Sequence, residues 1–338
     1  MGGFLNGARV EVWRGSVIES VHRGNVAVVD AAGRVRARSG DAELVSYARS
    51  ALKPIQALVL VEACVPEAFG WGVAELALCC GSHSGERRHV ELAASMLRSL
   101  GLEEGALACG PHAPMNEAAA NELRRAGREP RRLHNNCSGK HAGMLGLARV
   151  QGWPTSGYER AGHPVQQRML GAVAAWTGLP ADEISTAVDG CGVVTYALPL
   201  RSLAGAYARL GAAARGGQAG PRRIVQAMAS RPDLIAGTDR LCTALVRVTD
   251  GRICAKVGAE GVYAAAVVGA ELGVALKIED GAQRAAEPLL LAVLRELGVM
   301  SADEYGSLGR WAEPAVKNTR GEEVGRVRTV VGLEACDA

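Results

Sequence analysis

Strand-type patterns stand at both ends of this 338-residue sequence, with a mostly helical stretch between them. This layout limits the possible folds more than any other feature. Near the start, apolar and polar residues alternate, as in Val10–Trp13 and Val26–Val29. Such alternation is typical of half-buried strands. Turn signals at Arg23-Gly24 and Ala32-Gly33 therefore predict an antiparallel meander over the first 40 residues.

The last third of the sequence returns to the strand-type pattern. Short β-type runs separated by glycine-bearing turns cover residues 253–257, 261–268 and 273–279. Leu and Val at three-to-four spacing then predict a helix over 283–297. Residues 184–200 have strand and loop character. The other helical patterns are separated by Gly- and Pro-containing loops and cover 87–100, 115–128, 140–150, 163–177, 201–214 and 220–230.

These patterns predict an α+β fold in which both chain ends build one antiparallel sheet. We expect the helix that follows Ser50 and the C-terminal helix to cover this sheet, with a mostly helical lobe inserted between the strands. The predicted single catalytic domain has a sheet-and-helix lobe of residues 1–70 plus 235–338 and a helical lobe of residues 71–234. A cleft between two lobes is a common place for a small-molecule site.

Composition argues against several classes of protein. Apolar residues make up 48% and charged residues 22%, which is ordinary for a soluble globular chain. No apolar run approaches the roughly 20 residues that span a bilayer. Met1–Ala8 lacks the features of a signal peptide, and Asn6 stands where a myristoylation site needs Ser or Thr. We therefore expect a cytoplasmic protein.

Charge and cysteine content narrow the classes further. The net charge of +3 is too small to imply nucleic-acid binding. Nine cysteines, an odd number, argue for reduced thiols rather than a disulfide framework. The one basic cluster is interpreted as the solvated face of a helix and its exit loop. It comprises Arg124, Arg125, Arg128, Arg131 and Arg132.

Ser50 and Lys53 are the first candidate catalytic pair. They form a Ser-x-x-Lys pattern at the head of an apolar stretch, residues 57–63, that favours a helix. Residues three apart on a helix share a face, so the hydroxyl and the amine are expected within reach of each other. An uncharged lysine can take the proton of a serine and make it nucleophilic. Spacing alone favours the simpler alternative, an N-cap serine followed by a surface lysine.

Lysine usage changes this balance. Only five of the 38 basic residues are lysines: Lys53, Lys140, Lys256, Lys277 and Lys317. Arginine cannot replace a group that must lose a proton near neutral pH, whereas lysine shifts its pKa readily when buried. The few lysines are therefore expected where amine chemistry matters, above all at Lys53 and Lys256.

Two further motifs carry candidate polar groups. Ser82 and Ser84 lie in Ser82-His-Ser-Gly-Glu86, just before a predicted helix. We expect one of them either to cap that helix or to hold an anion together with backbone N–H groups. Lys256 precedes Val-Gly at a strand end. The sequence is equally compatible with a surface lysine at this position and with a lysine that projects into the cleft beside Ser50.

Residues 133–143 place two histidines, two asparagines, a cysteine and a lysine close together. With Cys191, this stretch offers thiolate and nitrogen ligands to a borderline metal such as zinc. It is not a finger-type Cys-x-x-Cys pair, so spacing alone leaves metal binding as one of several interpretations.

Together these motifs resemble the asparaginase II family, the rhizobial-type L-asparaginases. The residues that carry the resemblance are Arg49-Ser-x-x-Lys-Pro-x-Gln56, Ser82-His-Ser-Gly-Glu86, His134-Asn-Asn-Cys-Ser-Gly-Lys-His-Ala-Gly143, Asp189-Gly-Cys191 and Lys256-x-Gly-Ala-Glu-Gly261. They occur in the family's order over essentially the whole chain. The resemblance implies a fold similar to serine β-lactamases and penicillin-binding proteins. Lys256-Val-Gly resembles their Lys-Thr-Gly strand but departs from it at Val257.

The resemblance also implies roles for individual residues. Ser50 would be the nucleophile and Lys53 its base, with Ser82 and Lys256 as a second Ser/Lys pair in the same pocket. Arg49 would bind the substrate α-carboxylate through a bidentate contact. Further substrate-binding candidates are Asp189, Glu260 and His141. The two carboxylates suit the substrate ammonium, and the histidine would shape the pocket wall or orient a neighbour.

A zinc site is implied at Cys137, Lys140 and Cys191, with one zinc per chain. These ligands lack the His-rich, open shell of a hydrolytic zinc site, so we expect a supporting role. Lysine must be neutral to bind metal, and occupancy should therefore fall at acid pH.

The implied reaction hydrolyses the side-chain amide of L-asparagine to L-aspartate and ammonia through an acyl-enzyme. The expected partner is this small molecule, not a nucleic acid or a membrane, and the family suggests a homodimer. Glutaminase or another Ser-x-x-Lys acyl hydrolase stays open, because one methylene is worth only about 1–3 kcal/mol. A non-catalytic, zinc-holding sensor also stays open, and it would bind asparagine without releasing ammonia.

Overall fold

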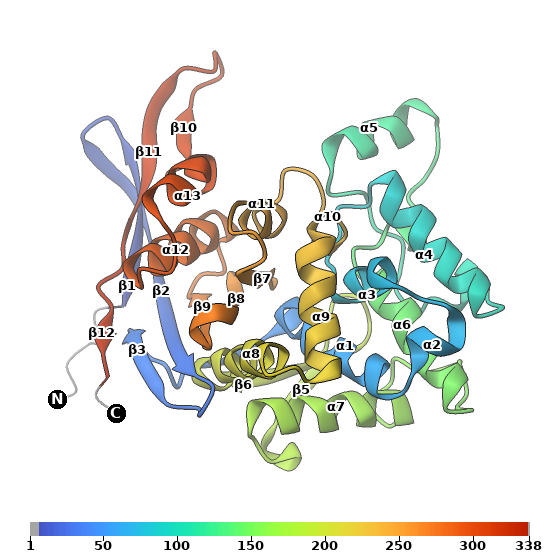
Figure 1. The fold of residues 1–338 in the computed structure, drawn as a ribbon. Coiled ribbons are helices and arrows are strands. Elements are labelled where there is room, and N and C mark those ends of the chain that lie inside the picture. Colours follow the sequence, from blue (N-terminus) through green and yellow to red (C-terminus); the bar gives the residue numbers. More distant parts are fainter. Residues whose placement is uncertain (1–6, 337–338) are drawn as a thin grey trace. The chain divides into compact units, whose positions relative to one another are not determined.

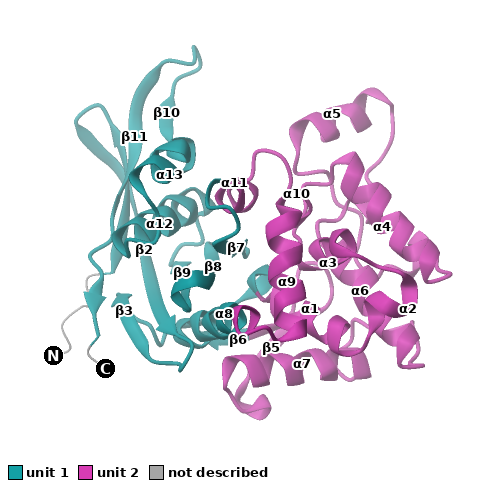
Figure 2. Cartoon of the chain, in the orientation of Figure 1, with its two compact units in different colours: residues 1–51, 197–212, 248–338 teal, residues 52–196, 213–247 magenta. Residues whose placement is uncertain are grey.

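The chain forms a mixed α/β structure that divides into two compact units (Figures 1 and 2). This computed structural model describes residues 7–336. Unit 1 comprises residues 1–51, 197–212 and 248–338, and unit 2 comprises residues 52–196 and 213–247. Residues 1–6, in which the sequence predicts neither a signal peptide nor a myristoylation site, lie outside the described residues.

Unit 1 is built on an antiparallel sheet that joins strands from both ends of the chain. Its strands are β1 (Ala8–Arg14), β2 (Val17–Asp30), β3 (Val35–Ser39), β7 (Ile253–Val257), β8 (Val262–Val267), β9 (Leu272–Ile278), β10 (Ala315–Lys317), β11 (Glu323–Val330) and β12 (Glu334–Ala335). Their order is β10-β11-β1-β2-β9-β8-β7, with β3 also beside β2 and β12 beside β3. The predicted antiparallel sheet made from both chain ends is confirmed.

The predicted turn at Arg23-Gly24 is wrong. Strand β2 runs straight through these residues, and the β1–β2 hairpin turns earlier, at Gly15, which has a φ of 55°. Gly24 has a packing role instead, because a Cβ there would lie 2.5 Å from Cδ2 of Leu289. The predicted turn at Gly33 is confirmed, with a φ of 86°.

Two helices pack on the sheet within unit 1. Helix α12 (Gln283–Glu296) contacts β1, β2, β8, β9 and β11, as predicted for the C-terminal helix. Helix α8 (Leu200–Arg215) approaches β9 so closely that a Cβ on Gly273 would overlap the carbonyl oxygen of Ala204. Smaller elements of unit 1 are α13 (Ala302–Ser307), α14 (Gly309–Ala312) and β4 (Val45–Tyr47).

The helix that follows Ser50 does not belong to the sheet unit, which corrects the prediction. This helix, α1 (Lys53–Glu62), lies in unit 2, where it packs against α3, α6, α7 and α9. Its side chains from Lys53 to Val61 are all buried. A helix buried on every side is suited to the centre of a helical assembly and not to covering one face of a sheet.

Unit 2 is mostly helical around α1. Its other helices are α2 (Val65–Phe69), α3 (Val73–Cys80), α4 (Arg87–Ser99), α5 (Glu117–Arg125), α6 (Ser138–Val150), α7 (Pro164–Thr177), α9 (Ala219–Ser230), α10 (Pro232–Ile235) and α11 (Leu241–Val248). Two short strands, β5 (Thr186–Val188) in unit 2 and β6 (Val194–Pro199), whose last three residues belong to unit 1, confirm the strand character predicted for residues 184–200.

Glycines on α6 bring this helix close to its neighbours. A Cβ on Gly139 would lie 2.5 Å from Cγ of Leu78, and a Cβ on Gly143 would lie 2.9 Å from Sγ of Cys79. Both neighbours belong to α3. The close approach fixes the start of α6 against the end of α3, where the polar motifs of unit 2 meet.

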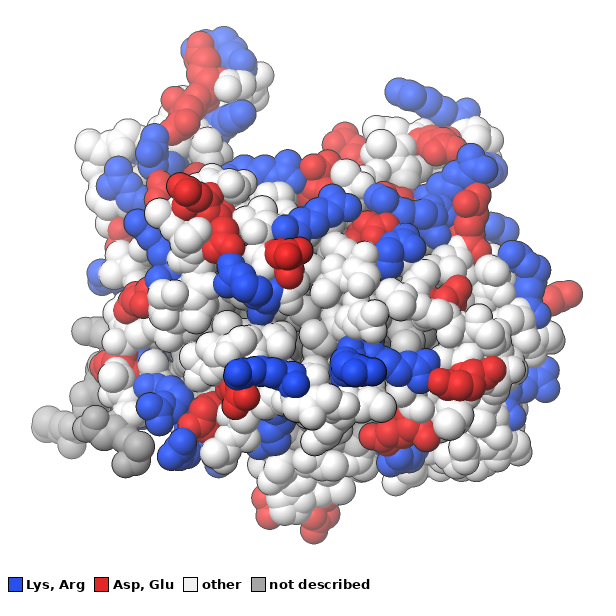
Figure 3. Space-filling view, in the orientation of Figure 1, with Lys and Arg blue, Asp and Glu red and all other residues white. Residues whose placement is uncertain are grey.

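Charges of both signs are interspersed on the face shown in Figure 3. Arginines of the predicted basic cluster follow this pattern, since Arg128 lies 4.0 Å from Glu122 and Arg131 lies 3.3 Å from Glu104. Among residues 7–336, every helix is too short or too polar to cross a bilayer.

Candidate active site

Ser50 lies in a strained turn. It is half-buried in the 3₁₀ turn η1 (Arg49–Leu52), which leads directly into α1. Arg49 has a φ of 50°, a left-handed conformation that non-glycine residues adopt at a cost. Tyr207 holds the turn by donating from its hydroxyl to the carbonyl of Ala51 at 2.6 Å. Backbone strain of this kind persists where the surroundings impose it, and it is common at active sites.

Lys53, the first residue of α1, is buried among neutral oxygens. Its side chain is 1% exposed. Its Nζ donates to the carbonyl of Gly81 at 2.6 Å and to Oγ of Ser82 at 2.8 Å. The surface-lysine alternative is therefore wrong. Within the described part of the chain, both of these partners are neutral oxygens.

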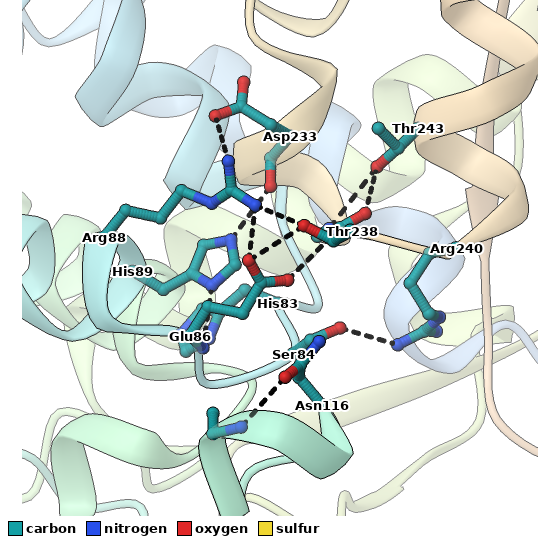
Figure 4. A network of polar contacts seen from close by, with 12 residues as sticks. His83, Ser84, Glu86, Arg88, His89, Asn116, Asp233, Thr238, Arg240 and Thr243 are labelled. Atoms are coloured by element: carbon teal, nitrogen blue, oxygen red, sulfur yellow. Dashed lines mark hydrogen bonds and ion pairs between the residues drawn. The ribbon is translucent and has the colours of Figure 1, made fainter. Parts of the chain in front are cut away.

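The Gly81–Glu86 segment that receives Lys53 is anchored from one side. The Ser82 N–H donates to the carbonyl of Ile235 at 2.8 Å, and the Ser84 hydroxyl donates to the carbonyl of Ala236 at 2.8 Å. Neither serine caps α4, so that prediction is wrong. The cap is formed by His89, whose Nδ1 accepts from the Glu86 N–H (Figure 4).

His83 connects this segment to the start of α6. Its backbone N–H donates to the carbonyl of Asn136, and its Nε2 lies 2.9 Å from Oγ of Ser138. Its Nδ1 accepts from the Gly85 N–H, so Nε2 carries the proton. Burial, followed by the charge of His89, lowers the pKa of His83 well below its usual value. A neutral histidine thus ties two of the motifs together.

The three residues of the implied metal site lie together in unit 2. Cys137 immediately precedes α6, Lys140 lies on its first turn, and Cys191 follows β5. Nζ of Lys140 is 3.2 Å from Sγ of Cys191. A hydrogen bond from Cys137 lowers the pKa of Cys191 to about 5, with Lys140 adding to the effect against burial. The same hydrogen bond raises the pKa of Cys137 to about 12.

This donor set fits a zinc ion chemically. Two sulfurs and one nitrogen converge, one sulfur is already a thiolate at neutral pH, and thiolate with nitrogen is a combination that zinc accepts. Over residues 7–336, no group of three His, Cys, Asp or Glu side chains is arranged to hold a metal. A site here therefore depends on Lys140 as its third ligand.

His141 offers an unused ring nitrogen beside this cluster. Its ring is fully buried, and its Nδ1 lies 2.6 Å from the hydroxyl of Tyr158. That hydroxyl also accepts from the Ala108 N–H at 2.9 Å. Nε2 has no hydrogen-bond partner in the described part of the chain. Burial, followed by the charge of Lys140, lowers the pKa of His141 to about 3.

Lys256 lies on β7 of unit 1 and is fully buried, which excludes the surface-charge alternative. Its Nζ donates to the carbonyl of Val257 at 2.8 Å. The strand end beyond it approaches the Ser50 turn, because a Cβ on Gly258 would lie 3.0 Å from the carbonyl oxygen of Ala48. Ala48 is two residues before Ser50.

The two candidate carboxylates lie in different surroundings. Asp189 is half-buried, with Oδ1 accepting from the Gly190 N–H and Oδ2 3.8 Å from Sγ of Cys191. Glu260 is exposed in a turn of unit 1 with a φ of 57°, and its carbonyl accepts from Nζ of Lys277. Asp189 thus adjoins the thiol cluster, whereas Glu260 faces solvent.

Comparison with known proteins decides the family. A family model described as L-asparaginase II matches residues 10–329. The chain belongs to the L-asparaginase II family.

Solved structures resemble the chain more distantly, and no curated protein matches it. Two structures described as Mglu in its native form align with 83% and 82% of the chain, at 15% and 18% identity and TM-scores of 0.44 and 0.37. The chain spans 66% and 60% of their length. The β-lactamase-like fold implied by the motifs stays a prediction.

Several site residues of this L-asparaginase II family member escaped sequence analysis. His83 lies inside the Ser82–Glu86 motif, but the sequence predicted no role for it. Tyr158 lies in a stretch without any motif, and nothing in the sequence connects it to His141. The acceptor at Gly81 is a backbone carbonyl, which no side-chain pattern reveals.

Proposed function

We propose that this protein hydrolyses the side-chain amide of L-asparagine to L-aspartate and ammonia through an acyl-enzyme on Ser50. The contacts of Lys53 are the observation that carries the proposal. The buried amine of Lys53 donates to the Ser82 hydroxyl, and Lys53 stands three residues after Ser50 at the head of α1. Lys53 can therefore serve as the base that takes the Ser50 proton.

In the proposed first half-reaction, the Ser50 oxygen attacks the side-chain carbonyl carbon of asparagine while Lys53 accepts the hydroxyl proton. The tetrahedral oxyanion needs donors, and the N–H of Ser50 at the head of α1 is the first candidate. Collapse transfers a proton to the leaving nitrogen and expels ammonia. Water then hydrolyses the aspartyl ester, and Ser50 regains its proton.

Ser82 and Lys256 are proposed as the second Ser/Lys pair. Ser82 already accepts from Lys53, so it can relay a proton between the base and the leaving group. Lys256 is proposed to contribute a second buried amine to the reaction.

Cys137, Lys140 and Cys191 are proposed to hold one zinc ion per chain. When bound, the ion would supply charge that fixes the thiolates and the lysine in one arrangement. Cys137 is followed directly by Ser138, which contacts His83. A metal that fixes Cys137 would therefore also help to fix the neighbouring residue Ser82, through the Ser138–His83 hydrogen bond. The proposed role is thus support of the pocket.

Ammonia release from L-asparagine and from L-glutamine tests the proposal, each with wild type and Ser50→Ala and with added zinc. We expect turnover of asparagine that disappears in Ser50→Ala. Wild type that prefers glutamine would move the assignment to glutaminase. Asparagine binding without ammonia release would instead indicate a sensor.

A further inference from the structure

We infer that Arg240 binds the α-carboxylate of the substrate, a role that the sequence motifs suggested for Arg49. The inference deepens the proposed asparaginase function and rests on it. It comes from the polar network around the Ser82–Glu86 segment, in which the Arg240 side chain points toward Ser84 (Figure 4).

Arg240 differs from the neighbouring arginines in its partners. Arg231 forms a bidentate pair with Asp233, with both contacts at 3.0 Å, and Arg88 pairs with Glu86 and Asp233. Arg240 is half-buried, yet within the described residues it has only two long contacts with neutral atoms. These are 3.5 Å to Oγ of Ser84 and 3.7 Å to Sδ of Met115.

These contacts leave the guanidinium mostly unsatisfied. The Ser84 hydroxyl already donates to the carbonyl of Ala236, and a thioether sulfur is a weak acceptor. A guanidinium carries five donors in a planar fork that matches a carboxylate bidentately. An anionic ligand of that shape is the group that Arg240 lacks.

The loop that carries Arg240 is held in a strained conformation. Gly237 has a φ of 123° and Asp239 a φ of 60°. Glu86 fixes the loop by accepting from the Thr238 N–H at 2.7 Å and from its hydroxyl at 3.1 Å. A Cβ on Gly237 would lie 2.5 Å from Oε1 of Glu86, so only glycine fits this position. Rigid support of this kind suits a ligand-binding side chain.

The same loop joins Arg240 to the proposed catalytic groups. It is continuous with Ile235 and Ala236, whose carbonyls anchor Ser82 and Ser84. Ser82 in turn accepts from Lys53. A carboxylate bound by Arg240 would therefore be positioned through the segment that positions the base.

Binding and kinetics of Arg240→Leu test the inference. By calorimetry we compare L-aspartate, the product, with 3-aminopropanoate, which lacks the α-carboxylate. We expect Arg240→Leu to lose aspartate affinity by roughly 10- to 100-fold, as for a charged hydrogen-bonded contact, and to leave the affinity for 3-aminopropanoate unchanged. Asparagine turnover should show the same loss in kcat/KM, with partial rescue by added guanidinium ion.

Two matched variants complete the design. Arg49→Leu tests the competing assignment, and Arg87→Leu removes an exposed arginine that pairs with Glu91. Aspartate affinity at the wild-type level in Arg240→Leu, or a selective loss in Arg49→Leu alone, would overturn the inference. Equal losses for both ligands would also overturn it, since they indicate a purely structural role. Arg240→Lys retains the charge and serves if Arg240→Leu fails to fold.

Wild-type behaviour separates this inference from the proposed function. A wild type that binds aspartate through Arg240 but releases no ammonia from asparagine would refute the hydrolase and leave the carboxylate site in place. If the wild type hydrolyses asparagine and Arg240→Leu does so equally well, the hydrolase stands and the carboxylate site at Arg240 is refuted.

Discussion

Two buried lysines of unit 2, Lys53 and Lys140, have the same side chain and opposite surroundings. Lys53 is 1% exposed and, among the described residues, donates to the carbonyl of Gly81 and the hydroxyl of Ser82. Lys140 is 6% exposed and donates to the Cys191 sulfur. Burial alone would lower the pKa of Lys140, but the charges of Cys191 and Cys137 outweigh it and raise the pKa.

The difference shows that burial does not decide what a lysine does. The Lys53 amine contacts neutral oxygens, whereas the charges of Cys191 and Cys137 keep Lys140 charged until a metal displaces the proton. Both side chains line one small cavity of about 10 Å³, so two chemical environments adjoin each other within one unit. The comparison predicts that substitutions at the two positions affect different properties.

Replacement of the two lysines by methionine is expected to give the largest contrast. Lys53→Met should lower kcat by roughly 10²–10⁴-fold, the usual contribution of a general base, while bound zinc stays at the wild-type level. Lys140→Met should lower bound zinc first and retain more of the activity. Ammonia release and elemental analysis of the purified proteins check both. Equal loss of zinc in the two variants would break the comparison.

Removal of the thiols tests whether the surroundings of Lys140 form a metal site. Cys137→Ser and Cys191→Ser should each weaken zinc binding by at least roughly 10–100-fold. Loss of a residue that only orients a ligand lowers metal affinity by that factor, and loss of the ligand itself should lower it at least as much. Cys254→Ser is the matched control, since burial raises the pKa of Cys254 to about 12 in unit 1. Competition with a chelator measures the affinities. A control that loses zinc equally would place the metal elsewhere.

Packing at the start of α6 is expected to have a smaller effect. Gly139→Ala would place a methyl group 2.5 Å from Cγ of Leu78, and such overpacking costs about 1–3 kcal/mol of stability. Gly171→Ala on α7 has open space and should instead stabilise by about 0.5–1 kcal/mol. Urea unfolding compares the two. A Gly139→Ala protein as stable as wild type would show that α6 can move away from α3.

Acid pH should destabilise the fold through His83. Burial lowers the pKa of His83 well below its usual value, so below about pH 6.5 the unfolded chain gains a proton that the folded chain does not. Stability should therefore fall as the pH decreases, by up to about 1.4 kcal/mol per pH unit for this one group. His83→Asn should flatten that slope, as measured by urea unfolding at several pH values. An unchanged slope would assign the acid sensitivity to other groups.

Periodicity predicted most of the elements and failed where a residue serves a distant neighbour. The alternation around Val26 gave β2, and the pattern at residues 283–297 gave α12. Gly24 was wrongly interpreted as a turn signal. Glycine is needed there because a side chain would collide with Leu289, which is remote in sequence. Strand β11 was missed because its exposed charged residues conceal the alternation, although it pairs with β1 along its length.

The candidate site could be predicted only as far as its motifs extend. Lys140 and Cys191 lie in contact across a long stretch of chain, a proximity that spacing alone left as one of several interpretations. The acceptors of Lys53 could not be predicted, because a backbone carbonyl at Gly81 has no signature in the sequence. Arg240 was overlooked for another reason: the sequence does not reveal that its contacts within residues 7–336 are with neutral atoms.

Mass spectrometry of the enzyme quenched during turnover of L-asparagine would test the central claim most directly. The account predicts a transient aspartyl ester on the peptide that contains Ser50, formed by wild type and absent from both Ser50→Ala and Lys53→Met. Ammonia release without any ester, or an aspartyl group on another residue, would contradict it.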